Sequence, residues 1–204
     1  MKHDFLFHIL FPVIFALMGG FFLGIALFGF AKKRGFFLSS RWMFALICVA
    51  FTPQIIQPLI WSSDSRIHPP LVLLLSPLMF AVLLVFFWLQ MRGFTGFGLG
   101  EDALRSGLAE VLQQRGLKFK ESMGGYDIES PSVKLQVSFQ AAMGTATIRT
   151  KSMSPDDRKF LAQVVGSLNE YLSKDSRPAN LQIFIFYLII SLFILGIGAF
   201  FVFR

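Results

Sequence analysis

Long apolar runs dominate the pattern of hydrophobic and polar positions along the chain. Four of these runs reach the roughly 20 residues that a helix needs to cross the hydrocarbon core of a bilayer. We expect membrane-spanning helices over residues 5–30, 42–61, 71–91 and 181–203. Trp42 and Trp61 bracket the second run and Trp88 lies near the end of the third, as in the aromatic belts of membrane proteins.

The segment between the third and fourth runs has the mixed composition of a soluble domain, with 12 Lys/Arg and 10 Asp/Glu in residues 92–180. Apolar residues at helical spacing predict a helix over 101–115 and a second helix from Pro155. Alternating apolar and polar positions predict strands between the helices, over residues 117–120, 126–129, 133–139 and 145–151. The glycines at positions 93, 96, 98 and 100 are interpreted as a flexible link to the third span.

The predicted fold is a membrane all-α bundle of four transmembrane helices with a small inserted α+β domain of order α-β-β-β-β-α. Three transmembrane helices are expected in residues 1–91, the soluble domain in residues 92–180, and the fourth transmembrane helix in residues 181–204.

The charge distribution predicts an orientation. Basic residues in short loops mark the cytoplasmic side of a membrane protein. The loop between the first two runs carries four of them: Lys32, Lys33, Arg34 and Arg41. The loop between the second and third runs carries only Arg66, so both termini are predicted outside and residues 92–180 in the cytoplasm. A bacterial inner membrane is the favoured location.

The net charge of +7 fits contact with anionic lipid headgroups, and we expect the four loop cations to make it. No nucleic-acid partner is predicted, because the membrane accounts for the excess of basic residues.

The histidines are weak candidates for metal or haem ligands. His3, His8 and His68 are all placed near the outer surface by the predicted topology. Their spacing matches no metal motif, so no metal and no cofactor is predicted. His8 lies deepest in its run and is the weak candidate for a cofactor contact.

Two glutamines interrupt the second run. Gln54 and Gln57 are three residues apart, beside Pro53 and Pro58, so their amides share one face of a helix. One interpretation is a kinked helix whose amides bond a neighbouring helix. The other is a substrate or quinone contact of the kind that broken helices provide in transporters.

Glycines in the spans are candidates for helix packing, because small residues let helices approach closely. Gly20 and Gly24 form a GxxxG spacing in the first run, and Gly196 and Gly198 thin one side of the fourth. The contact is expected either within the bundle or with another subunit.

The soluble segment contains no histidine and no cysteine, and no catalytic motif is recognisable, so an enzyme is not expected. The leading hypothesis is a non-catalytic accessory or scaffold subunit of a larger membrane complex. The alternatives are a small transporter or lipid- or quinone-binding membrane protein, and a membrane-anchored sensor that recruits a cytoplasmic partner. The expected partners are other membrane subunits and lipids, and a homo-oligomer is possible.

Overall fold

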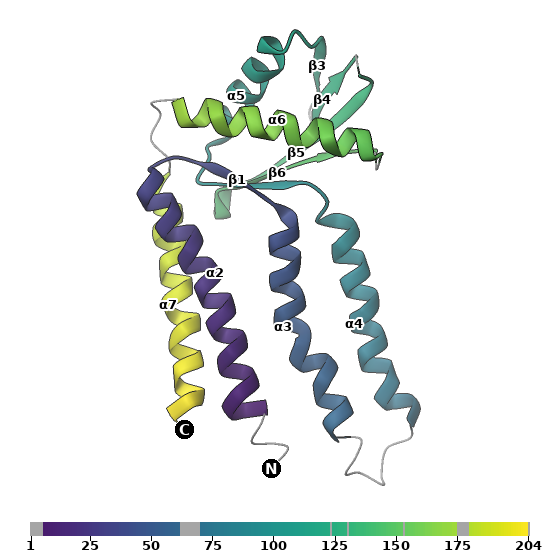
Figure 1. The fold of residues 1–204 in the computed structure, drawn as a ribbon, viewed down its shortest axis with the longest axis vertical. Helices are drawn as coiled ribbons and strands as arrows, with labels where there is room; N and C mark the ends of the chain where they lie inside the picture. Colours follow the sequence, from purple (N-terminus) through teal and green to yellow (C-terminus); the bar gives the residue numbers. More distant parts are fainter. Residues whose placement is uncertain are drawn as a thin grey trace. The chain divides into compact units, whose positions relative to one another are not determined.

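Helices and strands follow the chain in much the order that the hydropathy pattern predicts (Figure 1). The computed structural model describes residues 6–61, 70–122, 124–129, 131–152, 154–174 and 180–203. Its helical segments are η1 (Leu6–Leu10), α2 (Phe11–Lys32), α3 (Ser40–Trp61), α4 (Pro70–Gln90), α5 (Glu101–Gln114), η2 (Ala141–Met143), α6 (Pro155–Lys174) and α7 (Leu181–Phe203). Its strands are β1 (Phe36–Ser39), β2 (Phe94–Phe97), β3 (Phe119–Ser122), β4 (Gly125–Ile128), β5 (Val133–Gln140) and β6 (Thr145–Thr150).

The chain divides into two compact units. The helical unit consists of residues 1–24, 41–91 and 187–204. The sheet unit consists of residues 25–40 and 92–186. Residues 25–40, which were expected to form the end of the first span and the loop after it, therefore lie in the same unit as the sheet.

Helix α2 packs against α7 in the helical unit through stacked aromatic rings and one buried hydrogen bond. The ring of Phe201 lies 5.5 Å from that of Phe11 and 5.9 Å from that of Phe15. The fully buried Ser191 hydroxyl donates to the Gly19 carbonyl oxygen at 2.8 Å. The polar group in this contact is therefore satisfied, as groups within hydrocarbon must be.

Helix α3 contacts α4 through a second set of aromatic side chains. The rings of Phe44 and Trp88 lie 5.0 Å apart, and the ring of Phe51 lies 5.3 Å from Phe80 and 6.4 Å from Phe87. Such ring pairs stabilise a contact beyond the apolar area that they bury.

Two helices are long and apolar enough to cross a membrane, judged by length and composition: His8–Lys32 and Leu181–Phe203. Over the residues that the structure describes, two further apolar helical stretches are shorter, Ser40–Ile56 and Pro77–Gln90. Two of the four predicted spans thus meet the criterion, and the four-span architecture is not confirmed.

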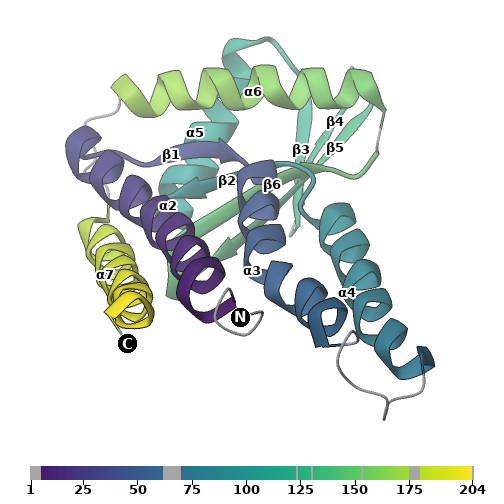
Figure 2. The ribbon, with the colours of Figure 1, turned by 60° about the horizontal axis from the view of Figure 1, so that its bottom comes forward.

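The sheet unit contains a six-stranded antiparallel sheet of order β1-β2-β6-β5-β4-β3 (Figure 2). The expected helix-strand-strand-strand-strand-helix order is confirmed by α5, β3 to β6 and α6. Two strands were not expected. Residues 94–97 form β2 and not a flexible link, and residues 36–39 form β1 and not a simple loop. These segments pair with each other and β2 pairs with β6, which explains why their short sequences are extended.

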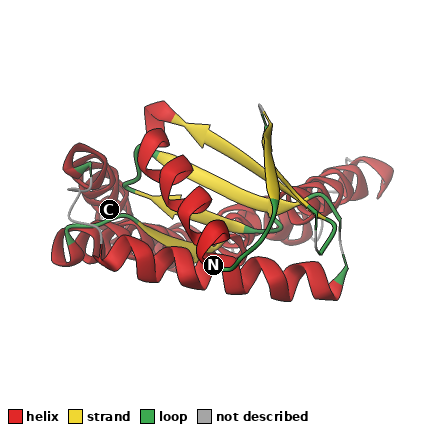
Figure 3. Ribbon diagram, turned by 90° about the horizontal axis from the view of Figure 1, so that it is seen from above, coloured by secondary structure: helices red, strands yellow, loops and turns green. Residues whose placement is uncertain are grey.

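The two faces of the sheet differ in what they carry. Helices α5 and α6 lie over one face (Figure 3), where alternate strand residues such as Tyr126, Leu135 and Ile148 point into the core. The helices contribute Leu104, Leu108, Val164 and Leu168, each at most 1% exposed. Their i, i+3 and i+4 spacing explains why each helix buries one side only.

The free edge of β1 is covered by one side chain of α6. The backbone N–H of Phe37 donates to Asn169 Oδ1 at 2.9 Å, and Asn169 Nδ2 donates to the Phe37 carbonyl oxygen at 3.4 Å. A single amide thus occupies the donor and the acceptor that a further strand would use. Exposed strand edges are prone to unwanted pairing, so this contact both ties α6 to β1 and protects the edge.

Replacing Asn169 should weaken the sheet unit. Asn169→Leu keeps the approximate volume of the side chain but leaves the Phe37 N–H and carbonyl without their partner, which costs about 1–3 kcal/mol of unfolding free energy. We expect a lower thermal midpoint in detergent and faster hydrogen exchange at the Phe37 amide. Glu170→Leu, at an exposed neighbouring position, is the matched control and should change the midpoint little. An unchanged midpoint and exchange rate in Asn169→Leu would show that the contact contributes nothing.

Candidate functional site

The glutamine pair predicted on the second run lies on α3. The Gln54 side chain is exposed, and the Gln57 side chain lies outside the described residues. The helix assignment of α3 continues past both positions to Trp61. The Thr52 hydroxyl donates to the Cys48 carbonyl oxygen at 2.9 Å, which provides that carbonyl with a second partner beside the proline. A ligand contact at Gln54 and Gln57 remains a prediction.

Of the predicted histidine ligands, only His8 is among the described residues. It is exposed on η1, while His3 and His68 lie outside the described ranges. Within the part of the chain that the structure describes, no group of three His, Cys, Asp or Glu side chains is placed to hold a metal ion.

The predicted packing glycines divide into two kinds. A Cβ built on Gly198 would lie 2.9 Å from Phe15 Cβ, so Gly198 takes part in the contact between α7 and α2. A Cβ on Gly20, Gly24 or Gly196 would meet nothing within 4 Å. These three are therefore open to whatever surrounds the protein.

The close approach of α2 to α7 uses a glycine that the GxxxG spacing did not identify. A Cβ on Gly19 would lie 2.6 Å from Leu195 Cγ and 3.3 Å from the Ser191 carbonyl oxygen. Gly19 is buried whereas Gly20 is exposed, so the two adjacent glycines face different sides of α2. The only signal in the sequence was that Gly19 and Gly20 are adjacent. Two adjacent glycines do not indicate which side of the helix packs against a neighbour.

The predicted headgroup cations lie around β1. Lys32, Lys33, Arg34 and Arg41 are all exposed. The Lys32 ammonium lies 5.6 Å from the centre of the Phe28 ring, and Lys33 ends the helix with φ +52°. A left-handed residue at this place turns the chain sharply from α2 into β1.

Aromatic rings join the helix ends of the sheet unit to the face of the sheet that α5 and α6 leave uncovered. The Phe184 ring of α7 stacks on Phe36 of β1 at 6.2 Å, and Phe36 lies 5.7 Å from Phe97 of β2. A Cβ on Gly29 of α2 or on Gly98 would overlap the Phe184 ring, at 2.3 and 2.4 Å. This aromatic cluster therefore needs glycine at both positions.

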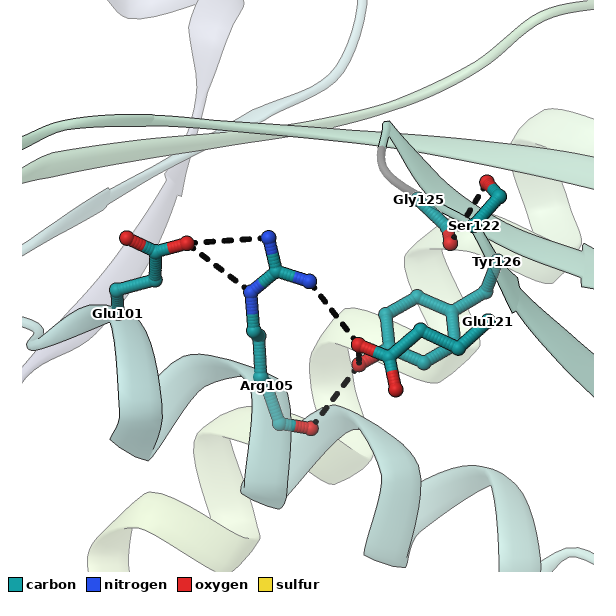
Figure 4. Close-up of polar contacts among 6 residues, drawn as sticks. All are labelled: Glu101, Arg105, Glu121, Ser122, Gly125 and Tyr126. Atoms are coloured by element: carbon teal, nitrogen blue, oxygen red, sulfur yellow. Dashed lines mark hydrogen bonds and ion pairs between the residues drawn. The ribbon is translucent and has the colours of Figure 1, made fainter.

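A cluster of polar side chains lies at the start of α5 (Figure 4). Arg105 Nε donates to Glu101 Oε1 and Nη1 donates to Glu121 Oε1 of β3, both at 3.0 Å. The hydrogen bonds to Glu121 and then Glu101 raise the pKa of Arg105 above its ordinary value. These two ion pairs link α5 to β3 at the edge of the sheet. Because their charges are exposed, the pairs contribute little stability.

Tyr126 lies beneath this ion pair. Its hydroxyl donates to the Arg105 carbonyl oxygen at 3.2 Å, and its ring is almost fully buried. Burial, and then the Glu121 charge, raises the pKa of the Tyr126 phenol. The raised pKa keeps the phenol protonated, and therefore neutral, at pH 7 beneath the surface ion pair.

The raised pKa of Tyr126 predicts a pH dependence of stability. Between the ordinary tyrosine pKa of 10.0 and the raised folded value, the unfolded chain loses this proton while the folded chain keeps it. The stabilisation of the folded state by the protonated Tyr126 hydroxyl is thus fully present below about pH 10 and falls as the pH rises further. Tyr126→Phe cannot titrate, so the melting-temperature gap between wild type and variant should shrink above about pH 10. A gap that is constant with pH would contradict the assignment.

No protein-family model, no curated protein and no solved structure matches this chain. The function is accordingly inferred from its own side chains.

Proposed function

We propose that this chain is a four-span membrane protein that acts as a non-catalytic accessory or scaffold subunit of a larger membrane complex. The observation that carries the proposal is the apolar outer surface of the helical unit. Large hydrophobic side chains are more than half exposed on α2, α4 and α7, including Leu17, Leu78, Val82, Ile189 and Phe193. An apolar surface of this extent is unfavourable in water, so lipid or another protein covers it.

The sheet unit supports the non-catalytic part of the proposal. Several of its described charges form exposed ion pairs, such as Arg105 with Glu101 and Glu121, and Lys134 with Asp127. Exposed pairs of this kind are typical of a solvated surface. Residues 92–180 contain no histidine and no cysteine, the residues most often used as general base or nucleophile.

The open glycines support a partner within the membrane. Gly20 and Gly24 are exposed on α2, four residues apart, and an added side chain would meet nothing of this chain within 4 Å. Small residues at this spacing allow another helix to approach closely. In the proposal, that helix belongs to a neighbouring subunit, which explains why the glycines are exposed here.

Leucine substitutions test the partner face. Gly20→Leu with Gly24→Leu should leave the melting temperature of the chain unchanged but remove a stoichiometric partner from the complex extracted in mild detergent, measured by native mass spectrometry. Gly19→Leu is the matched control, because its side chain would overlap Leu195 and lower the melting temperature, at a cost of about 1–3 kcal/mol. A wild-type chain that extracts as a lone monomer contradicts the scaffold proposal and favours the transporter alternative.

The proposed orientation places residues 92–180 in the cytoplasm, supported by the four cations of the first loop. In a Cys48→Ser background, Ser138→Cys should react with a membrane-impermeant maleimide only after cell lysis. Ser63→Cys, in the segment assigned to the outside, should react in intact cells. The reverse labelling pattern would invert the topology.

A further inference from the structure

Over strands β3 to β6, the face of the sheet opposite α5 and α6 is polar and carries an excess of positive charge. Strand residues alternate between the two faces, and the register places one set of polar side chains together on the uncovered side. The ionisable members of this set are Lys118, Lys120, Lys134, Arg149 and Lys151, against Asp127 and Glu129. Five basic and two acidic side chains give this face, which we call the open face, a formal charge of +3.

Like charges are adjacent on the open face at the end of β6. Leu135 pairs with Thr150 and the Lys151 N–H donates to the Lys134 carbonyl oxygen at 2.9 Å, so Lys134 and Lys151 are neighbours across β5 and β6. Arg149 is opposite Gln136, two residues from Lys134 on the same face. Like charges directly opposite each other destabilise a sheet unless a counter-charge is present. Asp127 supplies one such charge to Lys134, at 3.1 Å, and the described structure gives Lys151 no ion-pair partner.

The open face also lies where the chain enters and leaves its apolar helices. Phe184, in the first turn of α7, covers Phe36 at one end of the face. At the other end, a Cβ on Gly93, just after α4, would lie 3.1 Å from Arg149 Cβ. The Ser40 N–H, at the start of α3, donates to the Gly93 carbonyl oxygen at 3.0 Å. Arg149 therefore lies in space beside Gly93, close to the end of α4 and the start of α3.

We propose that the open face binds the anionic headgroups of the bilayer that holds the apolar helices, through Lys134, Arg149 and Lys151. The proposal rests on the membrane location given under the proposed function. A basic surface beside the ends of membrane helices is at the depth of the headgroup layer, and clustered Lys and Arg near a membrane attract anionic lipid. The lipid phosphates supply a counter-charge to Lys151, which lies beside the Lys134–Asp127 pair.

A fluorescence experiment on the full chain tests the contact. The chain is prepared in nanodiscs of pure phosphatidylcholine or of an equimolar mixture with phosphatidylglycerol. In a Cys48→Ser background, an environment-sensitive fluorophore is attached at Ser138→Cys on the open face or at Ser173→Cys on the exposed side of α6. Phosphatidylglycerol should shift the emission of the Ser138→Cys label to the blue, in a salt-sensitive manner, and leave the Ser173→Cys label unchanged.

Charge reversal identifies the residues responsible. Lys134→Glu with Arg149→Glu and Lys151→Glu should abolish the blue shift. The matched control is Arg158→Glu with Lys159→Glu and Lys174→Glu on α6, which changes the net charge equally and should keep it. Equal emission in the two lipids, or a shift that survives the open-face reversal, overturns the proposal. Failure of the wild-type chain to enter nanodiscs of either lipid would instead overturn the membrane location, so the two failures are distinguishable.

Discussion

The hydrogen bonds of a four-residue strand organise the sheet unit. Between α2 and α3, β1 pairs along its whole length with β2, so its backbone groups on that side are satisfied. On its other side, Asn169 meets the N–H and the carbonyl of Phe37. Without these partners, a short extended segment would leave its backbone unpaired, and unpaired backbone groups are costly when buried. Because β2 pairs in turn with β6, this one strand connects residues near α2 to the centre of the sheet.

The two faces of the sheet carry different kinds of side chain. The covered face is a conventional apolar core in which α5 and α6 bury Leu and Val side chains. The opposite face begins with aromatic rings at β1 and β2 and becomes polar toward β5. Under the proposed headgroup contact, this change from phenylalanine to lysine follows the change from hydrocarbon to headgroup at a bilayer interface.

Local periodicity was sufficient for part of the fold. The expected helix over 101–115 and strand over 133–139 correspond to α5 and β5 within a residue at each end. The strand expected from Leu117 begins later, at Phe119, because the Leu117 N–H closes the end of α5 by donating to the Leu112 carbonyl oxygen. In these segments the hydrophobic pattern and the tertiary structure agree, which is the condition under which such prediction succeeds.

The remaining features depend on contacts between distant residues. β1 and β2 are four residues long, and Gly96 makes β2 resemble a linker, so only their mutual pairing identifies them as strands. Asn169 looked like one more polar residue on an amphipathic helix, although it adjoins the buried stripe at Val165 and Leu168. The exposed Gly20 and the buried Gly19 are likewise distinguished only by the position of α7, which lies at the far end of the sequence.

The position of β1 in the chain has a consequence for biosynthesis. β1 is made directly after α2, but its strand partner β2 follows only after α3 and α4. Asn169, which covers its other edge, is 132 residues further along than Phe37. During translation, both edges of β1 are therefore unpaired while α3 and α4 are synthesised. β2 can then pair with one edge, and the other edge is covered only after Asn169 of α6 has been made.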